Sequence, residues 1–249
     1  MQAEAFDAQT NDVEELNRLA TQQRRKLVED LTQLRKHDIA YLRELHADPR
    51  KSYFLNVALL QEDDLSLVSV LTPENHQKRC EQLYFLGLSL GRILTSATSP
   101  SQVVVDSCQL MDELDFYFSQ SGIQNMKLVT VATKSPLYER EPKDSFTEPY
   151  RTVVRKWNNK PVYQRLVTPN VPFPLEYCQV VVSLCEVLTL VYGRVVDDVC
   201  SSNPCVFQAL LRFDEKIKKF FLESISKQLT TIATSVIKDE LALLRKATA

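Results

Sequence analysis

Glycine is scarce in this sequence, with four residues in 249, where average usage would give roughly 17. Glycine supplies the positive-φ turns and close backbone approaches that phosphate-binding loops, nucleophile elbows and tight hairpins require. Histidine is also rare, at three residues. A chain this poor in glycine is expected to be mostly helix packed on helix.

The motifs that usually carry catalysis are missing as well. The sequence has no G-x-x-x-x-G-K-[ST], no G-x-G-x-x-G, no G-x-S-x-G and no H-E-x-x-H. The histidines His37, His46 and His76 fall on the first predicted helix or beside a helix start. We therefore predict that the protein is not an enzyme and has no catalytic, cofactor-binding or metal-binding residues.

The charge is nearly balanced, since the formal net charge is -2 and the isoelectric point is about 6.0. No overall basic field favours nucleic acid, and contact with a membrane is expected only at its surface. The most apolar stretch, residues 180–196, is at the lower limit for a membrane span and indicates a buried helix instead. With no signal or transit pattern at the amino terminus, we expect a cytoplasmic protein.

The six cysteines include no C-x-x-C pair, and we expect reduced thiols. Four of them could in principle form a four-thiolate zinc site: Cys178, Cys185, Cys200 and Cys205. Two of these four lie in or beside the apolar stretch, where free cysteine behaves as a small hydrophobic residue, so core packing is favoured.

The first part of the chain, residues 1–49, is predicted to be an amphipathic, coiled-coil-like helix. Three leucines alternate by four and three and begin a short seam: Leu27, Leu31 and Leu34. Two interpretations stay open: the seam packs on the rest of the chain, or it binds a partner helix or a second copy.

Residues 50–249 are predicted to form a helical core domain, which makes the fold a mainly α helical bundle. Capping residues followed by proline mark helix starts at Thr72-Pro73, Ser99-Pro100 and Asn203-Pro204. The last of these opens a long C-terminal helix, and residues 175–199 form the central one. Gly87 and Gly91 predict a close helix crossing. Residues 52–71 fit either two short strands or two helical segments.

Residues 134–174 form a proline-rich insertion, with seven of the eleven prolines. We favour a small β-hairpin there, with its turn at 158–160. The stretch from 151 to 165 carries five cations and no acid, interleaved with aromatic residues, as expected of a partner-binding surface. The candidate residues are Arg151, Arg155, Lys156, Trp157, Lys160, Tyr163 and Arg165.

Three acidic clusters lie at 62–64, at 112–115 and at 197–198, and we expect them to be solvated. Our leading hypothesis is a non-enzymatic protein–protein interaction protein: an adaptor, scaffold or complex subunit, as in trafficking or cytoskeletal organisation. Its partners would be other proteins or a second copy bound through the long helices. The alternatives are a helical Mg-dependent enzyme acting on a diphosphate-type substrate, which needs two acid clusters facing one cavity, and a peripheral lipid-binding helical protein.

Overall fold

The computed structural model describes residues 2–48, 53–67, 70–119, 149–150, 154–158 and 160–247, without the side chains of 2–11, 155–157 and 160. The helices are α1 (Gln2–Ala47), α2 (Glu62–Leu65), α3 (Pro73–Ser96), α4 (Pro100–Phe118), α6 (Tyr177–Arg194), α7 (Asp198–Ser202), α8 (Pro204–Ile217), the π-helix η1 (Lys218–Glu223) and α9 (Ser224–Ala247). The strands are β1 (Tyr53–Phe54), β2 (Ala58–Leu59), β3 (Arg155–Trp157) and β4 (Lys160–Val162).

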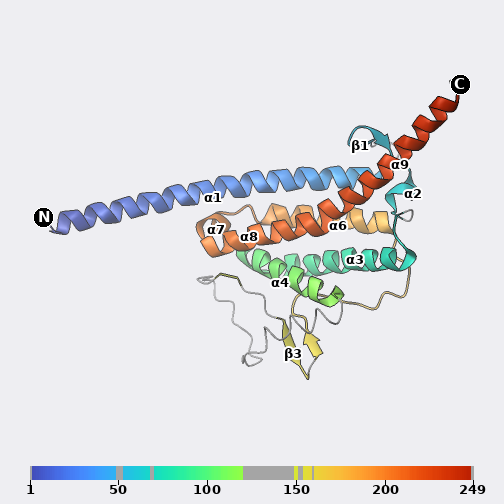
Figure 1. Cartoon of the computed structure of the whole chain (residues 1–249). Coiled ribbons are helices and arrows are strands. Elements are labelled where there is room, and N and C mark those ends of the chain that lie inside the picture. The colour runs from blue at the N-terminus through green and yellow to red at the C-terminus, as the bar shows by residue number, and fades with distance from the viewer. Residues whose placement is uncertain are drawn as a thin grey trace.

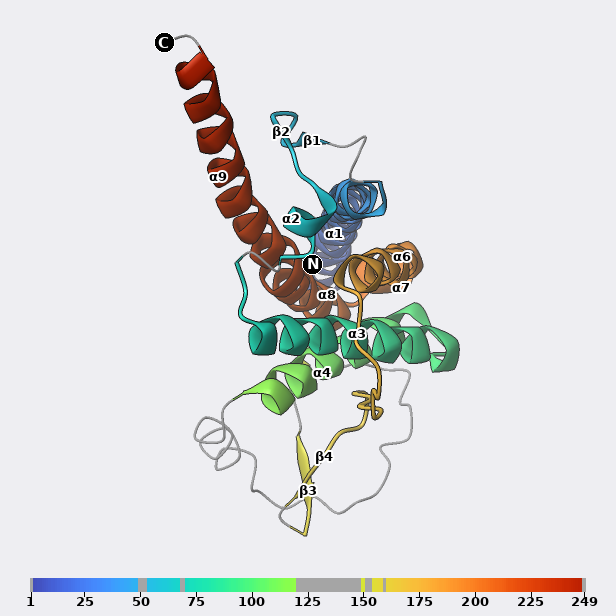
Figure 2. The same ribbon diagram turned by 90° about the vertical axis from the view of Figure 1, so that its right-hand side faces the viewer.

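The predicted mainly α bundle is confirmed, since helices account for most of the residues that the structure describes. In Figure 1, α1 runs along one side of the bundle, α6 and α8 lie beneath it, and α3 and α4 form the layer farthest from it. Figure 2, turned by 90°, separates α9 from α1 and shows the hairpin β3–β4 beyond α4. The N-terminal half of α1 and the C-terminal half of α9 extend past the bundle at opposite ends (Figure 1).

The helix starts lie where the capping residues predict them. The Thr72 hydroxyl accepts the Asn75 N–H at 3.3 Å, and the Ser99 hydroxyl accepts the Gln102 N–H at 3.3 Å. At the start of α8, the Asn203 side chain accepts from two backbone N–H groups. Each cap satisfies donors that have no partner within the helix, and a proline follows each cap at the first helical position.

The hydrophobic core joins α1, α3, α4, α6 and α8, with Ile39, Leu86, Val104, Leu188 and Phe213 among its buried members. α6 packs against both α1 and α3, as its apolar sequence predicts, but it ends at Arg194, and the chain re-enters helix at α7. None of the described helices is both long and apolar enough to cross a bilayer.

The close helix crossing predicted at Gly87 and Gly91 is wrong. A Cβ atom added at Gly87 would meet Leu184 Cδ1 at 3.7 Å, an ordinary contact, and one at Gly91 would meet nothing within 4 Å. Neither glycine therefore marks a contact too close for a side chain, and at Gly91 there is open space.

The ambiguous residues around 52–71 contain both kinds of structure: the hairpin β1–β2 and then the single turn of α2. The predicted second hairpin is confirmed within the described residues, where Arg155 pairs with Val162 and Trp157 with Lys160. Each strand has three residues, and after 162 the chain is bound to α4 instead of extending the ladder.

Candidate functional site: a groove between α1, η1 and α9

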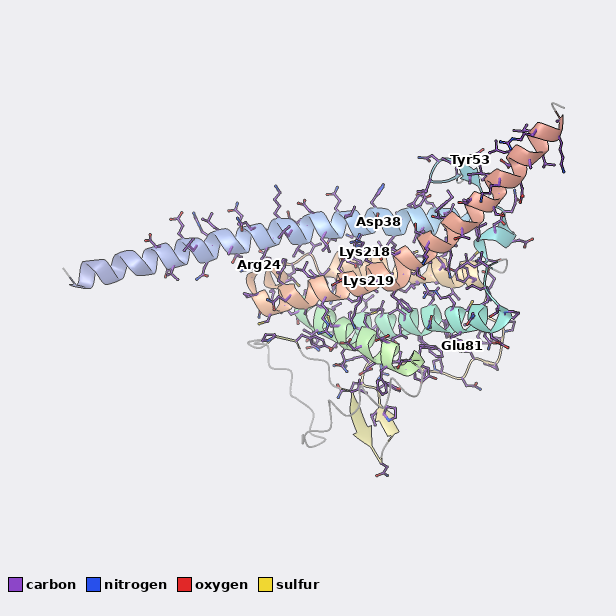
Figure 3. The ribbon with its side chains drawn as sticks, viewed as in Figure 1. Arg24, Asp38, Tyr53, Glu81, Lys218 and Lys219 are labelled. Atoms are coloured by element: carbon purple, nitrogen blue, oxygen red, sulfur yellow. The ribbon has the colours of Figure 1, made fainter. Side chains whose placement is uncertain are left out.

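A groove of about 620 Å³ lies where the C-terminal half of α1 approaches η1 and α9, with the hairpin β1–β2 at one end. Figure 3 labels Asp38 on α1 and Lys218 on η1, which line it from two elements. The full lining is Arg35, Asp38, Tyr41, Leu42, Phe54, Leu55, Lys218, Leu222, Glu223, Ser226, Lys227, Thr230 and Thr231.

The floor of the groove is apolar. Leu42, Phe54 and Leu222 line it, and all three are buried. They come from α1, the hairpin and η1, so the floor exists only because the fold brings these three segments together. Because these three side chains are already buried, a partner would remove apolar surface from water mainly at the edge of the groove, where Leu55 is exposed, at about 25 cal/mol per Å².

The wall formed by α9 is less polar than its sequence implies. The Thr230 hydroxyl donates to the Ser226 carbonyl at 2.7 Å, and the Thr231 hydroxyl donates to the Lys227 carbonyl at 3.1 Å. Because both hydroxyls bond within their own helix, the methyl groups are the part of these side chains left for a neighbour. Two threonines therefore contribute apolar contact area to a site that already has an apolar floor.

The rim carries two charges of each sign. Lys218 Nζ lies 3.4 Å from Glu223 Oε1, and Asp38 Oδ2 accepts from Arg35 Nη1 at 2.8 Å. Lys227 completes the rim on α9. Arg35 is neutralised by the buried Asp214, and the two lysines and two acids that remain cancel, so the groove offers no concentrated positive field to an anionic surface.

A buried ion pair beside the groove holds α1 against α8. Arg35 donates to Asp214 from Nε at 2.7 Å and from Nη2 at 3.2 Å, and the Tyr192 hydroxyl donates to the same carboxylate at 2.8 Å. Burial alone would lower the pKa of Arg35, but the hydrogen bonds to Asp214 and the charge of that carboxylate outweigh burial, and the pKa of Arg35 is raised. For the Tyr192 hydroxyl, burial acts in the opposite direction and raises the pKa. Arg35 stays charged, and its bidentate pairing fixes the position of α1.

The hairpin end of the groove is held in an unusual conformation. Leu55 and Asn56 have φ of 51° and 57°, the left-handed region that a leucine rarely adopts. The Leu55 N–H donates to the Tyr41 hydroxyl at 2.8 Å, and 61% of the leucine surface is exposed. Strained backbone presenting an apolar side chain at the edge of a groove is characteristic of binding sites.

The predicted seam of α1 is only partly placed as expected. Leu31 packs against the core, but Leu27 and Leu34 are 55% and 54% exposed. The row that faces α6 and α7 lies one residue further on and includes Val28, Thr32, Arg35, Ile39 and Leu42. The leucine spacing correctly indicated an amphipathic helix. The side of that helix that packs against the bundle is the neighbouring row, and not the row of leucines.

The basic aromatic segment is only partly within the described structure. Arg151 lies outside the described residues, as do the side chains of Arg155, Lys156, Trp157 and Lys160. The two remaining candidates contact α4. The Tyr163 ring lies 5.6 Å from that of Tyr117, and Arg165 Nε lies 3.0 Å from Asp106 Oδ1. These two candidate residues are therefore packed against the protein's own helix.

Glu113 has a role that sequence reasoning missed. We expected its cluster to be solvated, but Glu113 is fully buried, and its carboxylate accepts the backbone N–H groups of Gln164, Arg165 and Leu166 at 2.8–2.9 Å. Gln109 Nε2 also donates to it, at 2.8 Å. The spacing Gln109–Glu113 on a helix with a buried face was the available signal.

The other acids of α4 are also engaged. Asp112 pairs with Arg212 at 3.1 Å and with Lys216, and Asp106 is buried against Arg165. Among the residues that the structure describes, no group of three or more histidines, cysteines and acids is arranged to hold a metal ion. None of the acids at 112–115 and at 197–198 lines the groove, and Asp197 and Asp198 line a separate small cavity to which the acids at 112–115 do not contribute.

The cysteines fit the packing interpretation. Five are buried and Cys205 is partly exposed, and all six are free thiols. Burial raises the pKa of Cys185 to about 12 and that of Cys200 to about 11. Such thiols stay protonated and unreactive at neutral pH.

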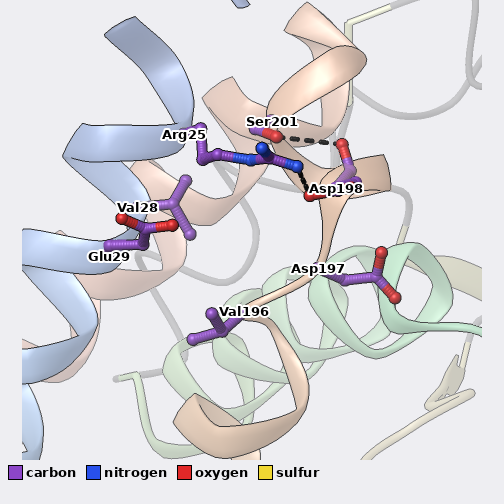
Figure 4. Close-up of a pocket in the computed structure, with 7 residues that line it drawn as sticks. All are labelled: Arg25, Val28, Glu29, Val196, Asp197, Asp198 and Ser201. Carbon is purple, nitrogen blue, oxygen red and sulfur yellow. Dashed lines mark hydrogen bonds and ion pairs between the residues drawn. The ribbon is translucent and has the colours of Figure 1, made fainter. Parts of the chain in front are cut away.

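A second, much smaller cavity of about 40 Å³ lies between α1 and the chain around α7. Figure 4 shows Arg25 reaching from α1 to the Asp198 carboxylate, and the Ser201 hydroxyl bonded to the Asp198 carbonyl. A volume of this size holds only a few water molecules. We interpret it as a seam between packed helices.

Comparison with protein-family models, with curated proteins and with solved structures finds no match for this chain.

Proposed function

We propose that this protein is a non-enzymatic interaction protein of the cytoplasm, an adaptor or complex subunit whose groove binds an amphipathic helix of a protein partner. One observation carries the proposal: an open groove of about 620 Å³ with a buried apolar floor, bounded by helices and rimmed by both signs of charge. Helices dock into such grooves with apolar side chains at i, i+3 or i+4, and i+7.

The composition of the rim favours a protein over an anionic membrane. Membrane headgroups are held by clusters of cations, whereas Lys218 and Lys227 here alternate with Asp38 and Glu223. A helix with an apolar stripe flanked by mixed charges matches both the floor and the rim. Leu55, exposed at the hairpin, would close over its end.

The test compares two exposed positions on different helices. Thr230→Glu places a carboxylate in the groove wall, and Leu190→Glu places one on α6, at a leucine that is 63% exposed and does not line the groove. Neither substitution disturbs a buried side chain. We expect Thr230→Glu to reduce partner recovery from cells at least tenfold, and Leu190→Glu to leave it unchanged.

Photo-crosslinking identifies what occupies the groove. A photoreactive amino acid at Leu55 should crosslink a partner peptide with helical apolar spacing, and the same probe at the exposed Leu190 of α6 should not. Equal crosslinking at both positions contradicts the proposal. Flotation with anionic vesicles that is lost in high salt would instead favour the lipid-binding alternative.

A further inference from the structure

The N-terminal half of α1 leaves the bundle and presents apolar side chains to solvent. Figure 1 shows this half extending past α7 and α8. Residues 12–19 are all exposed, including Val13 at 56% and Leu16 at 65%. A helix of this length without tertiary contacts is only marginally stable in water, so a partner along it would supply what the bundle does not.

Four apolar residues spaced by seven form a stripe along α1: Val13, Ala20, Leu27 and Leu34. Ala20 is half-buried and the other three are exposed, as is Leu16, which lies between the first two. The stripe lies about 100° around the helix from the row that packs on α6, which is why Leu27 and Leu34 stay exposed beside the bundle. A seven-residue apolar repeat is the contact pattern of paired helices.

One residue of each sign flanks the stripe: the exposed Asp12 beside Val13 and the exposed Lys26 beside Leu27. Arg24 and Arg25 are engaged within their own chain, with the Ser201 carbonyl and Asp198. Two such helices side by side and parallel would place Asp12 beside Asp12 and Lys26 beside Lys26. Placed antiparallel, Asp12 of one copy lies near Lys26 of the other, which is attractive over distances within the Debye length.

We infer that two copies of this protein associate through antiparallel α1 helices that cross near Ala20. In this register Val13 of one copy lies opposite Leu27 of the other, and Asp12 lies near Lys26. Ala20, the smallest residue of the stripe, lies at the two-fold axis, where the helices approach most closely. The interface is self-complementary, as a two-fold dimer requires.

The bundles lie at the two ends of the paired segment. Contact of α1 with the rest of its own chain includes the bond from Arg24 Nε to the Ser201 carbonyl at 2.7 Å and continues toward the C-terminus of the helix. In the register centred on Ala20, position 24 of one copy lies beside position 16 of the other, so each bundle begins near one end of the pair, on a face of α1 about 100° from the stripe. The groove between α1, η1 and α9 is not part of this interface.

The first experiment measures molar mass by light scattering during size-exclusion chromatography of the full chain. We expect twice the 28.6 kDa of the chain. The double variant Leu16→Glu with Leu27→Glu changes two exposed residues and should give the single mass. Leu190→Glu, at a leucine of 63% exposure on α6, is the matched control and should keep the double mass.

The second experiment determines the orientation by disulfide trapping in a Cys205→Ser background, since the other five cysteines are buried. A mixture of the Val13→Cys and Leu27→Cys proteins should form a crosslinked dimer on mild oxidation, and Val13→Cys alone should not. Efficient crosslinking of Val13→Cys with itself would show a parallel pair and overturn the inference. A wild-type chain of single mass would overturn it as well.

The outcome is independent of the groove. Thr230→Glu should leave the double mass unchanged, because α9 contributes nothing to the paired segment. Unchanged partner recovery in Thr230→Glu with a retained double mass would overturn the groove proposal alone, and a wild-type chain of single mass whose partner recovery is still lost in Thr230→Glu would overturn the dimer alone.

Discussion

Removal of the Glu113 carboxylate should detach the segment after the second hairpin from α4. Three backbone N–H groups, of Gln164, Arg165 and Leu166, donate to this one side chain, which is fully buried. The Val167 N–H adds a further bond to the Ser89 hydroxyl at 2.9 Å. In Glu113→Ala the three donors lose their acceptor in a place that water does not reach.

The expected size follows from these bonds. A hydrogen bond to a charged group contributes about 1.5–3 kcal/mol, and a buried donor without a partner costs about 1–3 kcal/mol. Three donors would set a cost of several kcal/mol if the segment stayed in place. Because the segment can instead swing into water, the cost of undocking limits the loss, and we expect a fall of about 3–5 kcal/mol in the free energy of unfolding.

Urea denaturation measures the fall in the free energy of unfolding. Amide hydrogen exchange then shows whether protection is lost at residues 164–166. Glu113→Gln keeps one acceptor oxygen and should lose roughly half as much. Asp115→Ala removes an exposed acid of the same helix and should change stability by less than about 1 kcal/mol. If Glu113→Ala costs no more than Asp115→Ala, or if the three amides keep their protection, the carboxylate does not hold the segment.

Three further predictions concern the bundle itself. Asp214→Ala should cost about 3–5 kcal/mol, because Arg35 is left as an unpaired buried charge, and adding Arg35→Leu should restore part of the loss; a urea midpoint near wild type for the single variant would refute this. Burial lowers the pKa of His46, so the folded protein keeps it neutral while the unfolded chain takes up a proton below about pH 6.5. Stability should therefore fall as the pH drops below that value, and less so in His46→Gln; a difference in melting temperature between the two proteins that does not vary with pH would count against it. Gly91→Ala should raise stability by about 0.5–1 kcal/mol, because a Cβ there meets nothing within 4 Å and alanine reduces the entropy of the unfolded chain; a lower denaturation midpoint would show an overlooked clash.

Local chemistry was enough to predict the helices and their starts. Thr72, Ser99 and Asn203 each cap a helix whose next residue is proline, and both the side-chain acceptor and the fixed φ act within one turn of the chain. The mainly α fold and the hairpin at 155–162 also follow from short-range patterns. Such features depend on neighbours in sequence and can be predicted from it.

The row of α1 that packs was decided by tertiary contacts. Leu27, Leu31 and Leu34 indicate a face, but the adjacent row through Val28 and Ile39 offers a comparable one. Only the approach of α6, and the pairing of Arg35 with Asp214 at a separation of 179 residues, selects between them. A difference of one residue turns a helix by about 100°.

The sequence alone determined that this chain forms rods of helix, where those rods begin, and that the usual catalytic motifs are missing. The tertiary structure decided which acids are buried, since the partners of Glu113 lie more than fifty residues away in the chain. It also decided where an apolar groove opens, because the floor needs Leu42, Phe54 and Leu222 from three separate segments. Burial and cavity shape are properties of packed surfaces, and no local pattern encodes which surfaces meet.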